Sequence, residues 1–361
     1  MSQPKVILGM SGGVDSSVAA ALLVQQGYDV EGVTLQVWEQ EDETAAVSKR
    51  WQERGCCKVG LARHVAKQLG IRHDVVDMRE PFRAGVIDDF LAGYLSGTTP
   101  NPCVRCNERV KLHGLHRLAE ERQADFVATG HYARIIAHET GLSLHRALDQ
   151  RKDQSYFLYR LQRAWLPRIL FPVGDMQKAD VWQHAERLGL PEEELKESQE
   201  ICFVTQGDYR RFIADQAPQS RRPGRFVAVT GEDLGRHEGS AFYTPGQRRG
   251  LGIAAGRRLY VHRVEAATST VVLGPEESLY HSSCIVTAVN LLQDDLWPES
   301  ETPLLADVKV RYATPAAPAL LWPASNGELS VQFQTPQRAL SPGQSAVFYD
   351  GDRVLGGGFI R

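Results

Sequence analysis

The chain has 361 residues, more than one compact domain usually holds, so we expect two or three domains around a substantial core. Its 42% hydrophobic and 24% charged residues are typical of a folded protein and exclude a chain dominated by disorder. The sequence shows no basic-then-apolar export signal, and no uncharged apolar run reaches the ~18 residues of a membrane span. We therefore expect a cytoplasmic protein with no membrane partner.

The first half of the chain alternates between strand-like and helix-like stretches, which predicts an α/β domain with a doubly wound parallel sheet. The expected strands are 5–9, 30–37, 72–76 and 125–129, and the expected helices are 16–26, 58–69 and 108–122. Residues 154–215 are expected to be mostly helical.

Beyond residues 216–220, short alternating apolar stretches are separated by Gly, Pro and Asp turns, a pattern typical of all-β modules. We expect three domains: a catalytic domain at 1–210, a small, mostly-β connector at 211–275, and a C-terminal antiparallel β-barrel at 276–361.

The segment Ser11-Gly12-Gly13-Val14-Asp15-Ser16 lies between the first expected strand and the first expected helix. A glycine-rich loop in this place directs backbone N–H groups at one point beside the positive end of a helix dipole, which favours phosphate binding. The loop lacks the lysine of the Walker sequence, so a different phosphate geometry is implied.

Each residue type in this loop has a chemical use. Gly12 and Gly13 would let the backbone approach a pyrophosphate, Ser11 and Ser16 would donate hydrogen bonds, and Asp15 could hold Mg²⁺. The simpler alternative is a glycine turn in which Asp15 or Ser16 caps the helix.

Six cysteines in a chain without an export signal favour thiol or metal chemistry over a disulfide framework. Cys106 lies on a Pro-rich turn before a helix, and the helix N-terminus with Arg105 and Arg109 is expected to lower its pKa and make it a reactive thiolate. Cys202 lies in a short apolar segment, where burial as a small hydrophobic side chain is the alternative. No role is assigned to Cys56, Cys57 and Cys284.

The loop resembles that of the PP-loop ATP pyrophosphatases, which cleave ATP between the α- and β-phosphates and pass AMP to a carbonyl or amide oxygen. Seven further motifs follow it in order, and together the eight resemble the tRNA-specific 2-thiouridylases over almost the whole chain. The motifs are SGGVDSS, NPxxxCN, ATGHY, KDQSYFLY, SxxICF, YTPGQRRGLGI, VRYA and PGQSAVFYDG.

The resemblance implies ATP-dependent replacement of the C2 oxygen of the wobble uridine by sulfur. It implies that Cys202 carries a persulfide and that Cys106 resolves it by forming a disulfide with Cys202. The implied partners are the anticodon stem-loop of tRNA and a sulfur donor such as a cysteine desulfurase or a sulfur-relay protein.

The resemblance also implies three sets of binding residues. The ATP site is implied at Gly9, Met10, Ser11, Gly12, Gly13, Val14, Asp15, Ser16, Leu35 and Gly130. The target base is implied to meet Asn101, Pro102 and Cys103. Contacts with tRNA are implied at His131, Lys152, Asp153, Gln154, Arg311, Tyr312 and Gln344.

One departure from the family concerns Cys103, where many members carry an Asp with an assigned acid/base role near the base. Cys103 also forms a Cys-x-x-Cys pair with Cys106, and Cys202 adds a third thiolate. Three thiolates are the ligand set of a [4Fe–4S] cluster with one open iron, which would present sulfide in place of a persulfide. A structural zinc is less favoured because the usual second CxxC or His pair is missing.

The net charge of −3 conceals an uneven distribution. Residues 221–263 hold nine arginines against three acids, a local balance of +6, which predicts a phosphate-binding surface in the connector. Arg248 and Arg249, in a glycine-flanked turn, are the expected tRNA contacts. The alternative is a solvated arginine-rich face.

Two other functions remain open on the residues alone. A PP-loop amide or argininosuccinate-type ligase would use the same nucleotide loop without paired cysteines. The second alternative function is that of a non-catalytic RNA-binding protein with a vestigial loop. The intact Ser11, Asp15 and Ser16 argue against this alternative.

Overall fold

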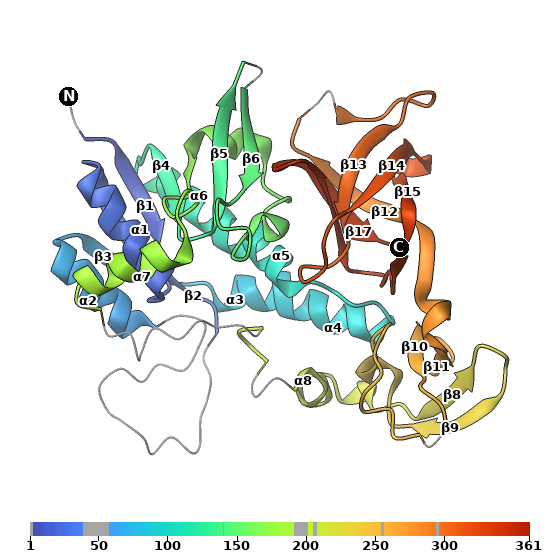
Figure 1. Cartoon of the computed structure of the whole chain (residues 1–361). Coiled ribbons are helices and arrows are strands. Elements are labelled where there is room, and N and C mark those ends of the chain that lie inside the picture. Colours follow the sequence, from blue (N-terminus) through green and yellow to red (C-terminus); the bar gives the residue numbers. More distant parts are fainter. Residues whose placement is uncertain are drawn as a thin grey trace. The chain divides into compact units, whose positions relative to one another are not determined.

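The computed structural model of the protein describes residues 3–38, 58–139, 141–190, 201–204, 208–253, 256–293 and 296–361. The chain divides into two compact units (Figure 1). The first unit comprises Met1–Val86, Cys103–Phe203 and Asp352–Val354, and the second comprises Ile87–Pro102, Val204–Gly351 and Leu355–Arg361. The division into domains at 1–210, 211–275 and 276–361 stays a prediction.

A five-stranded parallel sheet forms the core of the first unit, in the order β3-β2-β1-β4-β7. Its strands are β1 (Lys5–Gly9), β2 (Asp29–Gln36), β3 (Arg72–Asp77), β4 (Phe126–Thr129) and β7 (Ile169–Leu170). Val6, Ile7 and Leu8 of the central strand are fully buried, as expected for a strand covered on both faces. The predicted doubly wound parallel sheet is confirmed.

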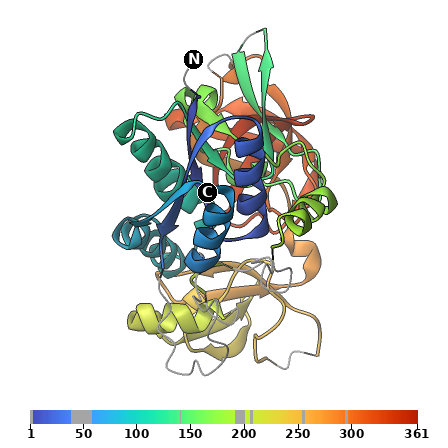
Figure 2. The ribbon, with the colours of Figure 1, turned by 90° about the vertical axis from the view of Figure 1, so that its left-hand side faces the viewer.

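Helices cover both faces of this sheet (Figure 2). They are α1 (Val14–Gln25), α2 (Val59–Leu69), α6 (Leu112–Glu121) and α7 (Lys178–Arg187). α1 packs with α2 and α7, and all three contribute to one apolar core with β1, in which Val18, Leu61 and Val181 are buried. α2 ends at Gly70 in the left-handed conformation, with φ of 69°, which glycine adopts without steric cost.

The helix predicted over 108–122 begins earlier and changes type along its length. It consists of α5 (Pro102–Cys106), a π-helical segment (Asn107–Lys111) and α6. A π-turn bonds residue i to i+5, so it brings residues five apart, such as Cys106 and Lys111, closer to one face than an α-helix does.

The prediction that 154–215 is mostly helical is wrong for the described part of that stretch. It contains short 3₁₀ turns at Ser155–Phe157 and Arg163–Arg168, then strand β7, α7 and α8 (Tyr209–Gln216). Pro167 lies inside the second 3₁₀ turn, and proline removes a backbone donor that a longer helix would need. Two unpredicted antiparallel strands, β5 (Ala133–His138) and β6 (Gly141–Arg146), form a hairpin after β4.

The second unit contains α4 (Asp88–Leu95), α8 and two β-structures. A four-stranded sheet has the order β10-β11-β8-β9, with β8 (Gly224–Ala228), β9 (Asp233–His237), β10 (Tyr260–Glu265) and β11 (Thr270–Gly274). A six-stranded antiparallel barrel, in the order β12-β15-β14-β13-β16-β17, is closed by pairing of β12 with β17. Its strands are β12 (Tyr280–Leu291), β13 (Leu304–Lys309), β14 (Ala317–Pro323), β15 (Leu329–Arg338), β16 (Ser345–Asp350) and β17 (Arg353–Ile360).

The barrel encloses its own apolar core, which includes Val308, Leu321, Val331 and Phe348. The predicted C-terminal β-barrel is therefore confirmed. Within the described ranges, none of the helices is both long and apolar enough to cross a membrane.

Candidate functional site

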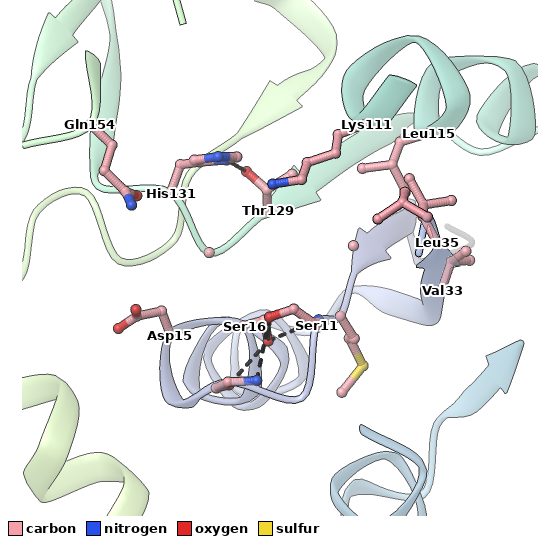
Figure 3. Close-up of a pocket in the computed structure, with 15 residues that line it drawn as sticks. Ser11, Asp15, Ser16, Val33, Leu35, Lys111, Leu115, Thr129, His131 and Gln154 are labelled. Carbon is pink, nitrogen blue, oxygen red and sulfur yellow. Dashed lines mark hydrogen bonds between the residues drawn. The ribbon is translucent and has the colours of Figure 1, made fainter. Parts of the chain in front are cut away.

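A cavity of about 220 Å³ lies in the first unit at the carboxyl ends of β1 and β4 (Figure 3). The strand order reverses between these two strands, because β2 and β3 continue on one side of β1 while β4 and β7 lie on the other. Ligands of doubly wound sheets bind at this switch point. The residues that line the cavity are Gly9, Met10, Ser11, Gly13, Asp15, Ser16, Val33, Leu35, Val37, Lys111, Leu115, Thr129, Gly130, His131 and Gln154.

The glycine-rich loop owes its course to two close backbone approaches. Gly12 has φ of +74°, and a Cβ there would collide with the backbone carbonyl of Lys58. A Cβ at Gly130 would lie 2.7 Å from the backbone N of Ser16. Larger residues at either position would push the loop out of place, so both glycines are needed for the shape of the cavity.

The serine hydroxyls of the loop lie side by side beneath the cavity, as Figure 3 shows. The Oγ atoms of Ser11 and Ser16 are 3.4 Å apart, and the Ser16 hydroxyl donates to the Gly13 carbonyl oxygen at 3.1 Å. Gly13 is the N-cap residue of α1, so neither Asp15 nor Ser16 occupies the capping position that the simpler interpretation gave them. The loop and the start of α1 therefore direct hydroxyl and backbone N–H donors at the cavity.

Asp15 stands at one end of the cavity in an ion pair. Its Oδ1 atom lies 2.6 Å from Nζ of Lys178, the first residue of α7, and accepts a hydrogen bond from the Tyr132 hydroxyl at 2.8 Å. The side chain of Lys178 is 10% exposed and that of Asp15 is 29% exposed. Sequence reasoning missed Lys178 and Tyr132, since each lies more than 100 residues from the loop.

The opposite end of the cavity is apolar. Figure 3 places Val33, Leu35 and Leu115 together there, away from Asp15, with the two serines between. Val33 and Leu35 lie near the carboxyl end of strand β2, and Leu115 lies in α6. An apolar slot followed by a row of donors suits a ligand with a flat base at one end and phosphates at the other.

His131 and Gln154 line the rim between these ends. The Gln154 side-chain oxygen accepts from the backbone N–H of Tyr132 at 3.0 Å, and His131 Nδ1 lies 2.8 Å from the Thr129 hydroxyl. Burial, with a smaller contribution from the nearby Lys111 ammonium, lowers the pKa of His131 to about 3. The imidazole is therefore neutral at physiological pH.

Cys103, Cys106 and Cys202 all belong to the first unit and carry thiols. Burial raises the pKa of Cys106 to about 12; Lys111 lowers it in part, and the neighbouring Cys202 and Cys103 raise it further. Electrostatic influence of this kind requires short separations, so the fold brings the three sulfurs into one neighbourhood.

The expectation of a lowered Cys106 pKa is wrong. Cys106 is buried, and the two arginines expected to stabilise its thiolate have other partners. Arg105 pairs with Glu108 at 3.0 Å, and Arg109 donates to the Gly85 carbonyl at 3.1 Å. Lys111 is the cation that lowers the pKa of this thiol. It could not be predicted from the sequence pattern, because its position relative to Cys106 depends on the π-helical segment.

Cys202 is held by the residue that follows it. Phe203 is 1% exposed, and its ring meets Phe82 edge-on at a centroid distance of 5.7 Å. Anchored in this way, the exposed Cys202 stays at the surface beside the core. Cys284 lies in β12 of the second unit, where burial raises its pKa to about 12, and Cys56 and Cys57 lie outside the described residues.

The arrangement of donor side chains bears on metal binding. Within the described ranges, no group of three or more His, Cys, Asp or Glu side chains has the geometry to hold a metal ion. Cys103, Cys106 and Cys202 as placed here do not form such a group, and the [4Fe–4S] cluster expected of them stays a prediction.

The other predicted tRNA residues have varied surroundings. Asp153 is 4% exposed, and its carboxylate accepts from the backbone N–H groups of Ala147 and Ser155, so it shapes the loop that carries Lys152 and Gln154. The tRNA contact expected of Asp153 stays a prediction.

In the second unit, three predicted residues organise backbone segments or reach solvent. The Gln344 side chain donates to the Thr99 carbonyl at 2.9 Å, just before Asn101 and Pro102. Arg311 donates to the Ala339 carbonyl and to the Ser341 hydroxyl, both at 2.8 Å. The next residue, Tyr312, is 40% exposed.

Comparison with known families divides the chain into three matches. Residues 4–206 match the tRNA methyl transferase HUP domain, residues 210–275 match the tRNA methyl transferase PRC-barrel domain, and residues 281–360 match the aminomethyltransferase beta-barrel domain.

Several curated proteins named tRNA-specific 2-thiouridylase MnmA are similar over the full chain. The one from Pelotomaculum thermopropionicum is 46% identical over 100% of this chain and 98% of its own. Those from Magnetococcus marinus and Acetivibrio thermocellus are 45% and 44% identical over 100% of both chains. A solved 4-thiouridine synthetase with RNA and bound ATP covers 60% of this chain and 51% of its own at 17% identity, with a TM-score of 0.35, too low to support an argument.

Proposed function

Because the chain belongs to the tRNA-specific 2-thiouridylase family and is an enzyme of that activity, we propose that it replaces the C2 oxygen of the wobble uridine with sulfur by way of an adenylated uridine and a persulfide on Cys202. The resemblance expected from the motifs is confirmed by relatives that match from end to end. The cofactors, the roles of single residues and the sulfur donor belong to the proposal.

The first step activates the uridine. A carbonyl oxygen is a poor leaving group, and adenylation converts its departure into the loss of AMP, which splits one high barrier into two lower ones. The uridine O2 attacks the α-phosphorus of ATP, and pyrophosphate leaves with the electron pair of the broken P–O bond. The cavity supports this step, since its apolar end suits adenine, its serines suit the phosphates, and Asp15 would hold the Mg²⁺ that accompanies ATP.

The second step moves the sulfur. The terminal sulfur of the Cys202 persulfide attacks C2 of the adenylated base, and AMP leaves with the C2–O electron pair. The Cys106 thiol, which burial keeps protonated, must then lose its proton and attack Sγ of Cys202, which forms the Cys106–Cys202 disulfide and leaves the terminal sulfur, with the electron pair of the broken S–S bond, on the base. A dithiol reductant returns both cysteines to thiols, and a cysteine desulfurase or sulfur-relay protein reloads Cys202. The common neighbourhood of the two sulfurs supports this step.

The target base must leave the anticodon loop before it can react, because a stacked base cannot reach a pocket. Asn101, Pro102 and Cys103 are the proposed contacts of the flipped base, with His131, Lys152, Asp153, Gln154, Arg311, Tyr312 and Gln344 toward the rest of the tRNA. Cys103 stands where many relatives carry an Asp, so a different group must serve as acid or base here.

The arginine-rich connector is the proposed phosphate-binding surface. Arg248, Arg257 and Arg258 line a hollow of about 340 Å³ together with Gly250 and Gly252. Clustered guanidinium groups beside small residues suit the phosphate backbone of RNA, which they contact without reading sequence. Affinity for tRNA should therefore fall steeply as salt is added.

One observation carries the proposal: Cys106 and Cys202, far apart in sequence, belong to the unit that holds the nucleotide-type cavity, and the Cys202 thiol is near enough to raise the pKa of Cys106. The test measures tRNA-dependent release of pyrophosphate from ATP, together with transfer of ³⁵S from cysteine to tRNA through a cysteine desulfurase. Both should occur with the wild type. Pyrophosphate release that needs a small amine and no tRNA would instead establish a ligase.

The [4Fe–4S] alternative is separated by a second measurement. Protein purified without oxygen is assayed for iron, acid-labile sulfide and absorbance, alongside sulfur transfer. We expect activity without stoichiometric iron. Activity that appears only with bound iron would contradict the persulfide step.

A further inference from the structure

The π-helical segment that follows Cys106 is tied to a distant part of the first unit by two adjacent side chains. The Asn107 side-chain nitrogen donates to the Phe157 carbonyl oxygen at 3.2 Å. The Glu108 carboxylate accepts a hydrogen bond from Nε of Arg160 at 2.8 Å. The partners are 50 and 52 positions apart in the sequence, so tertiary packing brings these two segments together.

Glu108 stands at the centre of a partly buried ion cluster. Its Oε1 atom lies 2.8 Å from Nε and 2.7 Å from Nη2 of Arg160, and its Oε2 atom lies 3.0 Å from Nη1 of Arg105. The Glu108 side chain is 20% exposed and those of both arginines are 17% exposed. Guanidinium groups on both oxygens of one carboxylate fix its direction. Loss of one member would leave a partly buried charge without its partner.

Arg109 adds a third tie, toward a second π-helical segment at Arg83–Ile87. Its Nη1 donates to the Gly85 carbonyl oxygen at 3.1 Å, and its Nε lies 4.0 Å from Oε2 of Glu108. The Arg109 side chain is 40% exposed, so this tie restrains the segment less than the Glu108 cluster does. π-turns are rare and occur mostly at functional sites, which favours a functional reason for these restraints.

The far end of the segment is held in a different way. Lys111 is followed by α6, which packs against β1 and β4, and Leu112 and Leu115 of that helix are 1% exposed. Apolar packing thus keeps Lys111 at the cavity, where Figure 3 shows its side chain. The Cys106 end is preceded by α5, which has only five residues. So short a helix is weakly stable, and the polar ties supply restraint that a longer helix would provide.

We propose that Glu108 is a positioning residue for sulfur transfer. Through its ion pair with Arg160 it fixes the start of the π-helical segment, and with it the line along which the Cys106 sulfur approaches Cys202. This assignment rests on the proposed function, in which Cys106 attacks Sγ of Cys202. Glu108 exchanges no proton or electron pair in that step and acts by geometry alone. A displacement of about 1 Å in a reacting atom can slow a reaction on the order of a hundredfold.

The test follows a single turnover in the absence of reductant. Protein whose Cys202 has been loaded as persulfide by a cysteine desulfurase is mixed with ATP and tRNA. Pyrophosphate release and formation of the Cys106–Cys202 disulfide are timed separately, the disulfide by mass spectrometry. Glu108→Gln has nearly the same size but lacks the charge. It should slow disulfide formation roughly tenfold and leave pyrophosphate release, including its dependence on ATP concentration, within about twofold of wild type.

A double variant shows whether Glu108 acts through its partner. Arg160→Met alone should slow disulfide formation about as much as Glu108→Gln. The two changes together should slow it no more than about twofold beyond either one, because residues that act as a unit are not additive. If either variant yields too little folded protein, Arg160→Lys keeps the charge without the planar fork and should slow disulfide formation less than Arg160→Met does.

The exposed pair Arg117–Glu121 of α6, 3.4 Å apart, provides the matched control. Arg117→Met with Glu121→Gln should leave both rates near wild type. A role in stability alone would lower the thermal midpoint of Glu108→Gln and leave the disulfide rate unchanged at temperatures well below it.

An unchanged disulfide rate in Glu108→Gln, equal slowing of both steps, or losses that multiply in the double variant would overturn the assignment of Glu108. A wild-type protein that thiolates tRNA without forming the Cys106–Cys202 disulfide would overturn the proposed sulfur-transfer step, and this assignment with it. The two failures are thus distinguishable by the behaviour of the wild type.

Discussion

The nucleotide cavity and the thiol neighbourhood lie in the same unit and are built in different ways. The cavity floor is a contiguous stretch, Ser11 to Ser16, in a fixed strand–loop–helix setting. The thiols come from two segments nearly one hundred residues apart, one on a helix with a π-turn and one beside a buried phenylalanine. Local geometry thus makes the first site, and tertiary packing makes the second.

This difference separates the two halves of the proposed reaction. Damage to the loop should stop adenylation and, with it, everything that follows. Damage to the thiols should stop sulfur transfer alone. Pyrophosphate release and ³⁵S transfer, measured on the same variant, report the two regions separately.

The largest expected effect is that of Cys202→Ser. A serine hydroxyl cannot carry the sulfane sulfur, so ³⁵S transfer to tRNA should fall below detection while tRNA-dependent pyrophosphate release continues. The matched control is Cys284→Ser, which alters the cysteine in β12 of the second unit and should leave both readouts near wild type. Full sulfur transfer by Cys202→Ser would refute the persulfide.

Gly12→Ala tests the other region. Its φ of +74° is strained for alanine, and the added Cβ would collide with the Lys58 carbonyl, so the loop must move. ATP affinity and both readouts should fall together, by roughly tenfold or more, given a strain of about 1–3 kcal/mol. Gly27→Ala is the control, because Gly27 also has positive φ but has open space around its Cβ position. If Gly12→Ala lost sulfur transfer but kept pyrophosphate release, the prediction that the loop serves adenylation would be contradicted.

The same distinction explains how much the sequence could predict. The loop, the parallel strands around it and the position of Gly130 and His131 after β4 follow from local patterns, namely an apolar strand, a glycine turn and a small-residue helix. The alternating strands of the barrel were predictable for the same reason, since period-2 patterns survive wherever one face is buried.

The surroundings of the cysteines were not predictable in this way. The helix N-terminus and nearby arginines indicated a low pKa for Cys106, but burial outweighed them, and burial depends on the whole fold. Lys111 acts on Cys106 across a π-turn, and Lys178 reaches Asp15 from a distant helix. Neither relation has a spacing that a sequence pattern encodes.

Lys111 offers a smaller and sharper test of the thiol neighbourhood. The pKa of Cys106, raised to about 12, keeps the thiol protonated at neutral pH, so its alkylation by iodoacetamide should rise about tenfold per pH unit between pH 7 and 10. Lys111→Met removes the charge that lowers this pKa, and alkylation at a given pH should slow by roughly tenfold. Mass spectrometry of the Cys106 peptide provides the measurement.

Two variants control for altered packing around Lys111. Lys111→Arg keeps the charge and should restore most of the alkylation rate, whereas Arg117→Met removes an exposed cation of α6 and should have no effect. An unchanged rate in Lys111→Met would show that burial alone controls Cys106.

His131 gives the smallest expected effect and belongs to the cavity. Its pKa is about 3 in the fold against 6.5 in the unfolded chain, so the unfolded chain binds a proton first as the pH falls. The stability that the neutral imidazole provides is therefore fully present above pH 6.5 and is lost as the pH falls from 6.5 toward 3. Between pH 7 and 5 the wild type should lose up to about 2 kcal/mol more unfolding free energy than His131→Gln, whose amide does not titrate.

His113→Gln, which alters an exposed histidine of α6, should follow the wild type in urea unfolding at both pH values. Parallel losses in wild type and His131→Gln would mean that the imidazole is not held neutral by burial in the fold.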